Sequence, residues 1–132
     1  MKFVNNDGGR SKYFPSKLKK DQAGDCVFRA IATALDKDYK EVWTDLFDLG
    51  YAIGQLPNCA KTYEKYLKDH GFIKQKTMKN RRGRKYKVNK APWKKDVIYV
   101  VHTTSHLTCV KGGDLHDTWN CGEWCANSFY TK

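Results

Sequence analysis

Cys26 stands where a polar loop gives way to a segment with helical periodicity, within the stretch GDCVFRAIATAL at residues 24–35. Asp25 is a favoured N-cap residue, and apolar residues recur at helical spacing from Val27 onward, so we predict a helix that begins beside the cysteine. A thiol in the first turn of a helix faces unpaired backbone N–H groups and the positive end of the helix dipole. Both stabilise the thiolate, which is the nucleophilic form of cysteine. The alternative is an inert cysteine packed at the start of a helix, which is common.

A nucleophilic thiol needs a base, and a predicted hairpin near the C terminus selects one of the four histidines. With Gly112-Gly113 as a two-residue turn, the alternation of side chains puts His106 on the same face as Asp117 of the next strand. The two residues are then diagonal neighbours, with Cα atoms roughly 7 to 8 Å apart. Cys26, His106 and Asp117 are therefore candidates for a catalytic triad, in which the imidazole exchanges a proton with the thiol and the carboxylate orients the ring. A three-residue turn would shift this register.

The other histidines and cysteines have simpler explanations. His116 falls on the opposite face of the hairpin, His102 ends the preceding strand, and His70 lies at a predicted helix end. Cys121 and Cys125, with His116 upstream, are the best metal candidates, but zinc sites need a second ligand pair at short spacing. We therefore predict no metal site.

The elements that must position these residues change from helical to strand patterns along the chain. Apolar residues three and four apart predict helices over 27–35, from Tyr39 to near Gly50, and over about 60–70. Beyond Pro92 the pattern favours strands in the segments 97–101, 106–110, 115–119 and, at a sheet edge, 129–130. Helices followed by an antiparallel sheet make the predicted fold class α+β.

Length and composition set further bounds. A chain of 132 residues, 40% of them hydrophobic, is long enough for one core, so residues 1–132 are interpreted as a single domain. The N-terminal residues contain no apolar stretch of signal-peptide length, and no apolar run is long enough to cross a bilayer. Five cysteines without a disulfide pattern fit a reducing compartment. We expect a soluble cytoplasmic protein without a membrane partner.

The net charge of +11 comes from one segment. Eleven basic residues and no acidic one lie between Lys74 and Lys95, where Asn80 to Gly83 predicts a turn and 85–88 an alternating strand. This segment, predicted to be a basic hairpin or loop, has three interpretations. The first interpretation is a solvated surface feature. The second is a nucleic-acid binding segment with Tyr86 and Trp93 available for stacking, and the third is a segment that steers an acidic protein substrate.

Two patches of the sequence carry a family resemblance. GDCVFRAIATAL resembles the nucleophile segment of the papain-like cysteine peptidase superfamily, and its GDC-aromatic-RA core is especially similar to that of the ovarian-tumour-type deubiquitinases. HLTCVKGGDLHDTW, at residues 106–119, is similar to the histidine and acid strands of double-glycine peptidases. Small phage proteins pair both patterns, and DGGR and DKDYKEVW also look like segments of those proteins. The order Cys, His, Asp is the order that the superfamily uses.

The resemblance implies a papain-like fold, with N-terminal helices packed on a C-terminal antiparallel sheet. It implies hydrolysis of an amide or isopeptide bond, with Cys26 as nucleophile, His106 as general base and then acid, and Asp117 as the residue that orients the ring. Gln22, four residues before the nucleophile, becomes a candidate oxyanion donor beside the Cys26 backbone N–H. Ala23 stands where ovarian-tumour-type enzymes have an aspartate, which speaks against a deubiquitinase.

The resemblance also bears on cofactors and partners. It implies no metal or organic cofactor, a protein or peptide substrate that belongs to a host if the chain is phage-encoded, and a location in the host cytoplasm in that case. Deamidases, acyltransferases and inactive binding modules share such folds, so these activities stay open. A silent module would bind nucleic acid or a host protein through the basic segment 74–95. None of these motifs specifies an oligomeric state.

Overall fold

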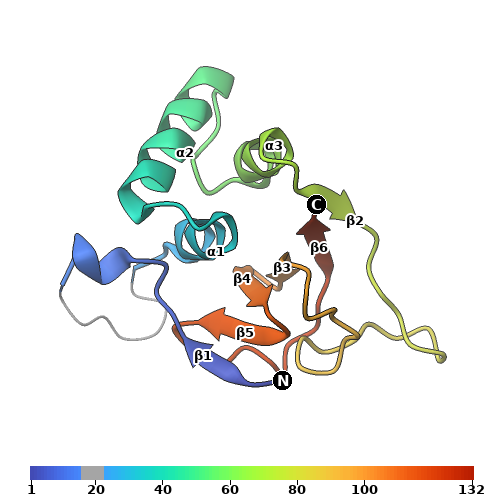
Figure 1. The fold of residues 1–132 in the computed structure, drawn as a ribbon. Helices are drawn as coiled ribbons and strands as arrows, with labels where there is room; N and C mark the ends of the chain where they lie inside the picture. The colour runs from blue at the N-terminus through green and yellow to red at the C-terminus, as the bar shows by residue number, and fades with distance from the viewer. Residues whose placement is uncertain (16–22) are drawn as a thin grey trace.

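A six-stranded mixed sheet with three α-helices on one side of it makes up the computed structural model, which describes residues 1–15 and 23–132 (Figure 1). Its helices are α1 (Cys26–Leu35), α2 (Tyr39–Ile53) and α3 (Ala60–Asp69), with a short 3-10 helix at Arg10–Lys12. Its strands are β1 (Phe3–Asn5), β2 (Ile73–Gln75), β3 (Tyr99–Thr103), β4 (His106–Lys111), β5 (Asp114–Asp117) and β6 (Ser128–Thr131). The predicted α+β class is confirmed.

The sheet itself differs from the prediction of a C-terminal antiparallel sheet. The strand order is β1-β5-β4-β3-β6-β2, and β1 pairs with β5 in parallel. Both edge strands precede the C-terminal part of the chain, and β6 lies inside the sheet rather than at its edge. The two edge strands have three residues each. Strands of three residues are too short to show an alternating pattern in the sequence. Their pairing depends on which edges β5 and β6 leave open.

The helices begin as predicted, and α2 runs further than predicted. Gly54, with φ 72°, caps α2, whereas Gly50 lies inside the helix and is buried. A Cβ atom on Gly50 would lie 2.6 Å from the carbonyl oxygen of Gln55. This glycine therefore permits the close return of the chain after α2, and does not mark the helix end.

The hairpin register on which the site depends is confirmed. Lys111 pairs with Asp114 and Cys109 with His116, across a turn in which Gly112 and Gly113 both have positive φ. This conformation is the one that a two-residue turn between twisted strands requires.

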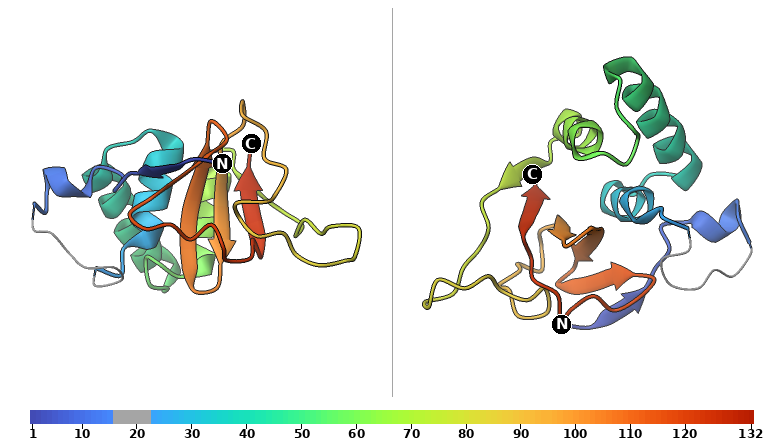
Figure 2. Two further views of the ribbon diagram at one scale, coloured as in Figure 1. Left: turned by 90° about the horizontal axis from the view of Figure 1, so that it is seen from below. Right: turned by 180° about the vertical axis from the view of Figure 1, so that it is seen from behind.

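Apolar side chains pack on both faces of the sheet. The face toward the helices contains Ile31 of α1 against Leu107 and Cys109 of β4. The opposite face holds a second cluster, formed by Val88, Tyr99, Val101, Val110, Leu115, Cys121 and Ala126. The segment between β2 and β3 thus packs on the sheet from the side away from the helices (Figure 2).

The predicted strand over 85–88 does not form. Lys85 and Lys87 each make only an isolated bridge, to Lys79 and Cys125 respectively. Asn80 closes the predicted turn, since its backbone oxygen accepts from the Gly83 N–H. None of the helices in the described part of the chain is long and apolar enough to span a membrane.

Candidate active site

Cys26 is the first residue of α1. The side chain of the preceding residue does not cap the helix N-terminus. Asp25 occupies the N-cap position but its carboxylate accepts no hydrogen bond from the first turn. Instead it is buried and accepts from Tyr39 Oη at 2.7 Å and from Arg10 at 2.8 Å. The N–H groups of the first turn are thus not used by Asp25, and such groups stabilise an adjacent negative charge.

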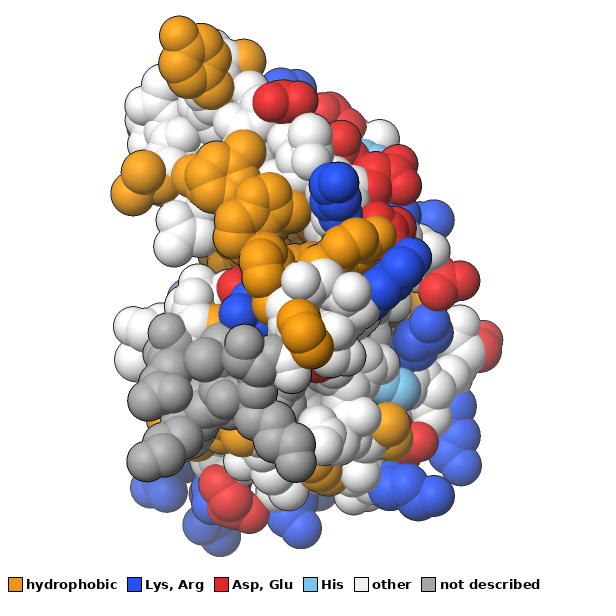
Figure 3. Space-filling view, turned by 90° about the vertical axis from the view of Figure 1, so that its left-hand side faces the viewer, with side chains coloured by type: hydrophobic (Ala, Val, Ile, Leu, Met, Phe, Trp, Pro, Cys, Tyr) orange, Lys and Arg blue, Asp and Glu red, His pale blue; other side chains and the backbone are white. Residues whose placement is uncertain are grey.

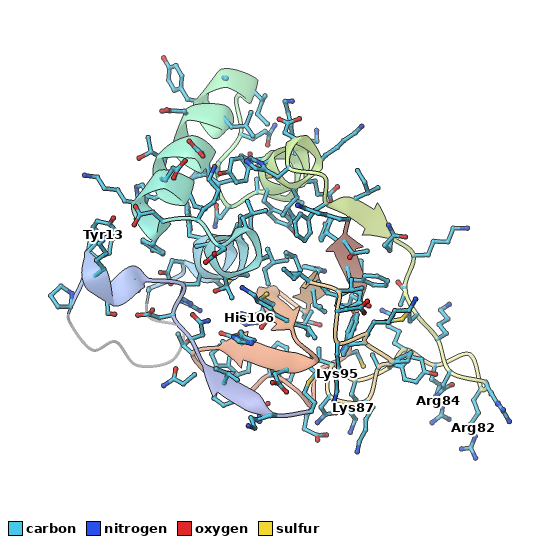
Figure 4. The ribbon with its side chains drawn as sticks, in the orientation of Figure 1. Tyr13, Arg82, Arg84, Lys87, Lys95 and His106 are labelled. Atoms are coloured by element: carbon cyan, nitrogen blue, oxygen red, sulfur yellow. The ribbon has the colours of Figure 1, made fainter. Side chains whose placement is uncertain are left out.

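His106 begins β4 and Asp117 ends β5, and their side chains meet. His106 Nε2 and an Asp117 carboxylate oxygen are 2.7 Å apart, with both residues buried. His106 lies close to β5 on the side of α1 (Figure 4). Trp119 packs against the imidazole at 4.7 Å between ring centroids. The diagonal neighbours expected from the hairpin register are therefore in direct contact.

Cys26 is electrostatically coupled to this pair. Burial alone would raise the pKa of the Cys26 thiol, but a hydrogen bond with His106, one with the backbone of Leu107 and the charges of His106 and Arg29 lower it overall. Because Asp117 engages Nε2, Nδ1 is the ring nitrogen left for the thiol. The elements that carry these residues pack together, since α1 lies against β4.

The pKa values of His106 and Asp117 shift in opposite directions. Burial opposes the charged imidazolium, yet hydrogen bonds with Asp117, Cys121 and Cys26 raise the pKa of His106 well above its ordinary value. Burial likewise opposes the carboxylate, but the hydrogen bond with His106 and its charge lower the pKa of Asp117. The site therefore favours a thiolate and an imidazolium backed by a carboxylate, which is the charge state of a nucleophilic cysteine with its acid.

Cys121 is a neighbour of the triad that the sequence did not suggest. Its thiol lies 3.6 Å from the Asp117 carboxylate, and it is fully buried after the end of β5. His106, Asp117 and Cys121 together offer nitrogen, oxygen and sulfur within 4.8 Å of one another, a set that could hold a metal ion. However, the 2.7 Å between His106 and Asp117 is a hydrogen-bond distance, so these two groups contact each other directly. Cys125, the other predicted metal candidate, is exposed and is not part of this group.

A narrow crevice, too small to admit a water molecule, adjoins Cys26. Asn6 of the loop after β1 and His116 of β5 line it, and the Asn6 side-chain amide is 3.2 Å from His116 Nδ1. Any polypeptide substrate must therefore lie outside this crevice. A larger cavity of about 540 Å³ adjoins the opposite end of α1 and does not reach the thiol.

An aromatic surface is formed by α2 and the segment that follows the 3-10 helix (Figure 3). The Trp43 ring lies between those of Phe14 and Phe47, at 5.7 and 5.2 Å between ring centroids, and it also contacts Phe28 of α1. Phe14 and Phe47 are 42% and 44% exposed. Apolar side chains of Phe14 and Phe47 are thus available to a ligand, whereas Phe28 is buried.

Gln22, the candidate oxyanion donor, lies outside the described residues. Comparison of the chain with protein-family models, curated proteins and solved structures finds no match. Inference about function therefore depends on the geometry and electrostatics of the site.

Proposed function

We propose that this chain is a papain-like cysteine hydrolase that cleaves an amide or isopeptide bond in a protein or peptide. The observation that carries the proposal is the 2.7 Å contact of buried His106 with Asp117, on an imidazole that lowers the pKa of a cysteine at a helix N-terminus. A structural histidine–aspartate pair needs no thiol at its second nitrogen. A catalytic one does.

The proposed reaction begins with attack of the Cys26 thiolate on the substrate carbonyl carbon, which forms a C–S bond and an oxyanion. Backbone N–H groups at the start of α1 stabilise the oxyanion. As the intermediate collapses, the C–N bond breaks and the His106 imidazolium protonates the leaving amine. The neutral imidazole then takes a proton from water, whose oxygen attacks the thioester and releases the carboxylic acid and the thiolate. Asp117 keeps the ring oriented throughout and stabilises its charged form.

The aromatic surface of Phe14, Trp43 and Phe47 is a candidate contact for apolar side chains of a polypeptide substrate. All five cysteines are free in the structure, which supports activity in a reducing compartment such as the cytoplasm. A deamidase or an acyltransferase would form the same thioester intermediate and differ in the leaving group or in the acceptor.

The test compares Cys26 with Cys125, a more exposed thiol without an imidazole partner. Wild-type protein is treated with iodoacetamide at pH 6.5, and the modified cysteines are quantified by peptide mass spectrometry. We expect Cys26 to react at least about tenfold faster than Cys125, because a pKa lowered by one unit gives about tenfold more thiolate. His106→Gln should remove this advantage. Faster modification of Cys125 than of Cys26 would contradict the proposal.

The reaction type needs a second experiment. Incubation of wild-type and Cys26→Ser protein with a proteome-derived peptide library separates the alternatives. New amino termini that appear only with wild-type protein identify a peptidase. Mass increases of about 1 Da at glutamine or asparagine identify a deamidase, and new amide linkages identify an acyltransferase.

We infer a second candidate function, binding of duplex nucleic acid, from the basic segment 74–95. Of its eleven basic side chains only Lys74 and Lys87 form ion pairs with carboxylates of the described residues. The segment is nevertheless anchored, because Val88 is fully buried, and burial of one such side chain stabilises a fold by about 1.5 to 3 kcal/mol. Arg82 and Arg84 lie at the end that projects from the body of the protein (Figure 4).

Trp93, one of the two predicted stacking residues of this segment, is held by the fold, whereas Tyr86 is partly exposed. Trp93 donates its indole N–H to the Val88 carbonyl at 2.7 Å and packs against Tyr99 and Phe129. It is therefore unavailable for the base stacking that single-strand binding uses. Unpaired cations on a projecting turn instead suit contacts with phosphates that do not depend on base sequence.

Fluorescence anisotropy with a labelled 20-base-pair duplex tests this second function. Cys26→Ala protein is compared with a variant that also has Arg81, Arg82 and Arg84 changed to glutamine, and with a charge-matched control changed at Lys40, Lys61 and Lys68. We expect the first triple variant to bind at least about tenfold more weakly and to have a smaller salt dependence. Equal binding by both triple variants would contradict a specific role of the turn. Loss of activity on acidic substrates without loss of DNA binding would identify substrate steering instead.

A further inference from the structure

The carboxylate of Asp25 is the centre of a buried polar cluster directly before the nucleophile. Asp25 is 2% exposed, and it accepts hydrogen bonds from Tyr39, Arg10 and Arg29. Two arginines around one carboxylate leave a net positive charge, which is unusual for a buried group unless another anion lies near. The other anion is Asp117.

Arg29 connects the two carboxylates. One of its terminal nitrogens pairs with Asp25, and the other lies 3.9 Å from Oδ1 of Asp117. Asp117 uses its second oxygen, Oδ2, for His106 at 2.7 Å. The two oxygens of Asp117 thus have different partners. Oδ2 contacts the imidazole, whereas Oδ1 accepts the Thr118 backbone N–H at 2.7 Å and also faces the guanidinium. Arg29 is also one turn along α1 from Cys26, so both side chains lie on the same side of the helix.

We propose that Arg29 is a positioning residue that holds Asp117 in the orientation in which it binds His106, by bridging it to the Asp25 anchor before the nucleophile. This inference rests on the proposed cysteine hydrolase. A guanidinium suits the task because its planar fork presents several N–H donors at once, so a single side chain spans two carboxylates. A lysine ammonium supplies the same charge from one atom and cannot keep both contacts at these positions.

The simplest competing explanation is that Arg29 only neutralises Asp25. Arg10 provides the matched control for this explanation. Both arginines pair with Asp25 and both are largely buried, with side chains 19% and 12% exposed for Arg10 and Arg29. Among the described residues, only Arg29 of the two also pairs with Asp117. A role through Asp25 alone therefore predicts equal effects of substitution at either arginine, whereas a role at Asp117 predicts an effect at Arg29 only.

The first experiment measures the rate of Cys26 alkylation by iodoacetamide from pH 5 to pH 9 in wild type, Arg10→Gln, Arg29→Gln and Arg29→Lys. We expect Arg29→Gln to lower the rate at pH 6.5 about tenfold and to move the profile to higher pH by about one unit. Arg10→Gln should leave the profile within about 0.3 units of wild type, and Arg29→Lys should recover part of the shift through its charge. Equal shifts for Arg10→Gln and Arg29→Gln would overturn the proposal.

The second experiment does not depend on thiol reactivity. A buried imidazole N–H that binds a carboxylate gives a downfield proton resonance that exchanges slowly with water, and proton NMR records it directly. We expect this His106 signal in wild type and Arg10→Gln, and its broadening or loss in both Arg29→Gln and Arg29→Lys, with the fold of each variant checked by circular dichroism. Retention of the signal in Arg29→Lys would reduce the role of Arg29 to its charge, against the proposal.

The two experiments separate failure of this inference from failure of the proposed function. If Cys26 of the wild type shows no enhanced reactivity, the hydrolase proposal fails. The imidazole resonance still decides whether Arg29 positions Asp117. If Cys26 is reactive and Arg29→Gln changes neither readout, only the positioning role fails.

Discussion

The triad region and the basic segment 74–95 carry charge in opposite ways. The buried carboxylates Asp25 and Asp117 each have a cationic partner, from Arg10 and Arg29 in the first case and from His106 in the second. In the basic segment, nine of eleven cations have no carboxylate partner among the described residues, and water surrounds them. Burial makes an unpaired charge costly, whereas an exposed charge is stabilised by solvent.

This difference shows that buried charges change the chemistry of neighbouring groups, whereas exposed charges act over longer distances. Pairing within the interior lowers the pKa values of Cys26 and Asp117 and raises that of His106, which favours a thiolate beside an imidazolium. Exposed and unpaired cations leave local chemistry unchanged but produce a field that attracts anionic partners. Substitutions in the two regions should therefore affect different properties, and four predictions test this contrast.

The largest effect is expected for Asp117→Asn. Loss of the carboxylate removes the charge that stabilises the His106 imidazolium and the acceptor that orients the ring. We expect hydrolysis, once a substrate peptide is identified, to fall by about 10³- to 10⁴-fold, as for triad acids in general. Steady-state kinetics measure the loss. A decrease below tenfold with intact structure would show that His106 does not need Asp117.

Gly8 and Gly83 offer a matched pair of glycines from the two regions. Both have positive φ, but a Cβ on Gly8 would lie 2.6 Å from the Arg29 carbonyl oxygen, whereas a Cβ on Gly83 meets nothing within 4 Å. Gly83→Ala should cost only the backbone strain, about 1 kcal/mol, while Gly8→Ala should cost more because the chain must also move away from α1. Urea unfolding measures both. Equal losses would contradict a tight contact between the N-terminal loop and α1.

The stability contributed by the His106–Asp117 pair should depend on pH. The raised pKa of His106 means that its contribution is full below about pH 6.5 and declines as pH rises toward the folded-state pKa, by at most about 1.4 kcal/mol per pH unit. The lowered pKa of Asp117 means that its contribution is full above about pH 4 and is lost on acidification. The difference in unfolding free energy between wild type and Asp117→Asn should thus be larger at pH 5.5 than at pH 9.

Glu123→Gln is the exposed control for that measurement. Glu123 pairs with Lys87 at 2.8 Å on the surface of the basic segment. Solvent and salt screen such a pair, so its removal should leave unfolding nearly unchanged at both pH values. An effect as large as that of Asp117→Asn would remove the contrast between the two regions.

The smallest effect on stability is expected for Arg81, Arg82 and Arg84 changed to glutamine together. These residues are exposed and make no ion pair with a described carboxylate. We expect the midpoint of thermal unfolding to stay within about 2 °C of wild type, while retention on a heparin column decreases. Marked destabilisation would mean that the turn supports the fold and does not serve binding alone.

Local pattern and turn chemistry alone predicted much of the candidate site. The start of α1 at Cys26 follows from local propensity, and the pairing of Lys111 with Asp114 follows from the Gly112-Gly113 turn. Side-chain alternation then brings His106 to Asp117 without further information. Each of these inferences involves residues close in sequence, where conformational preference and strand register dominate.

Only the tertiary structure decided the remaining contacts. The parallel pairing of β1 with β5, the approach of Arg10 to Asp25 and the place of Cys121 beside Asp117 join groups that sequence periodicity does not relate. Of the predicted aromatic stackers, the structure turns Trp93 inward, and it extends α2 past Gly50. The sequence by itself thus determined the reactive segments and the hairpin register. Packing decided which distant side chains neutralise the buried charges of Asp25 and Asp117, because neutralisation depends on proximity in space.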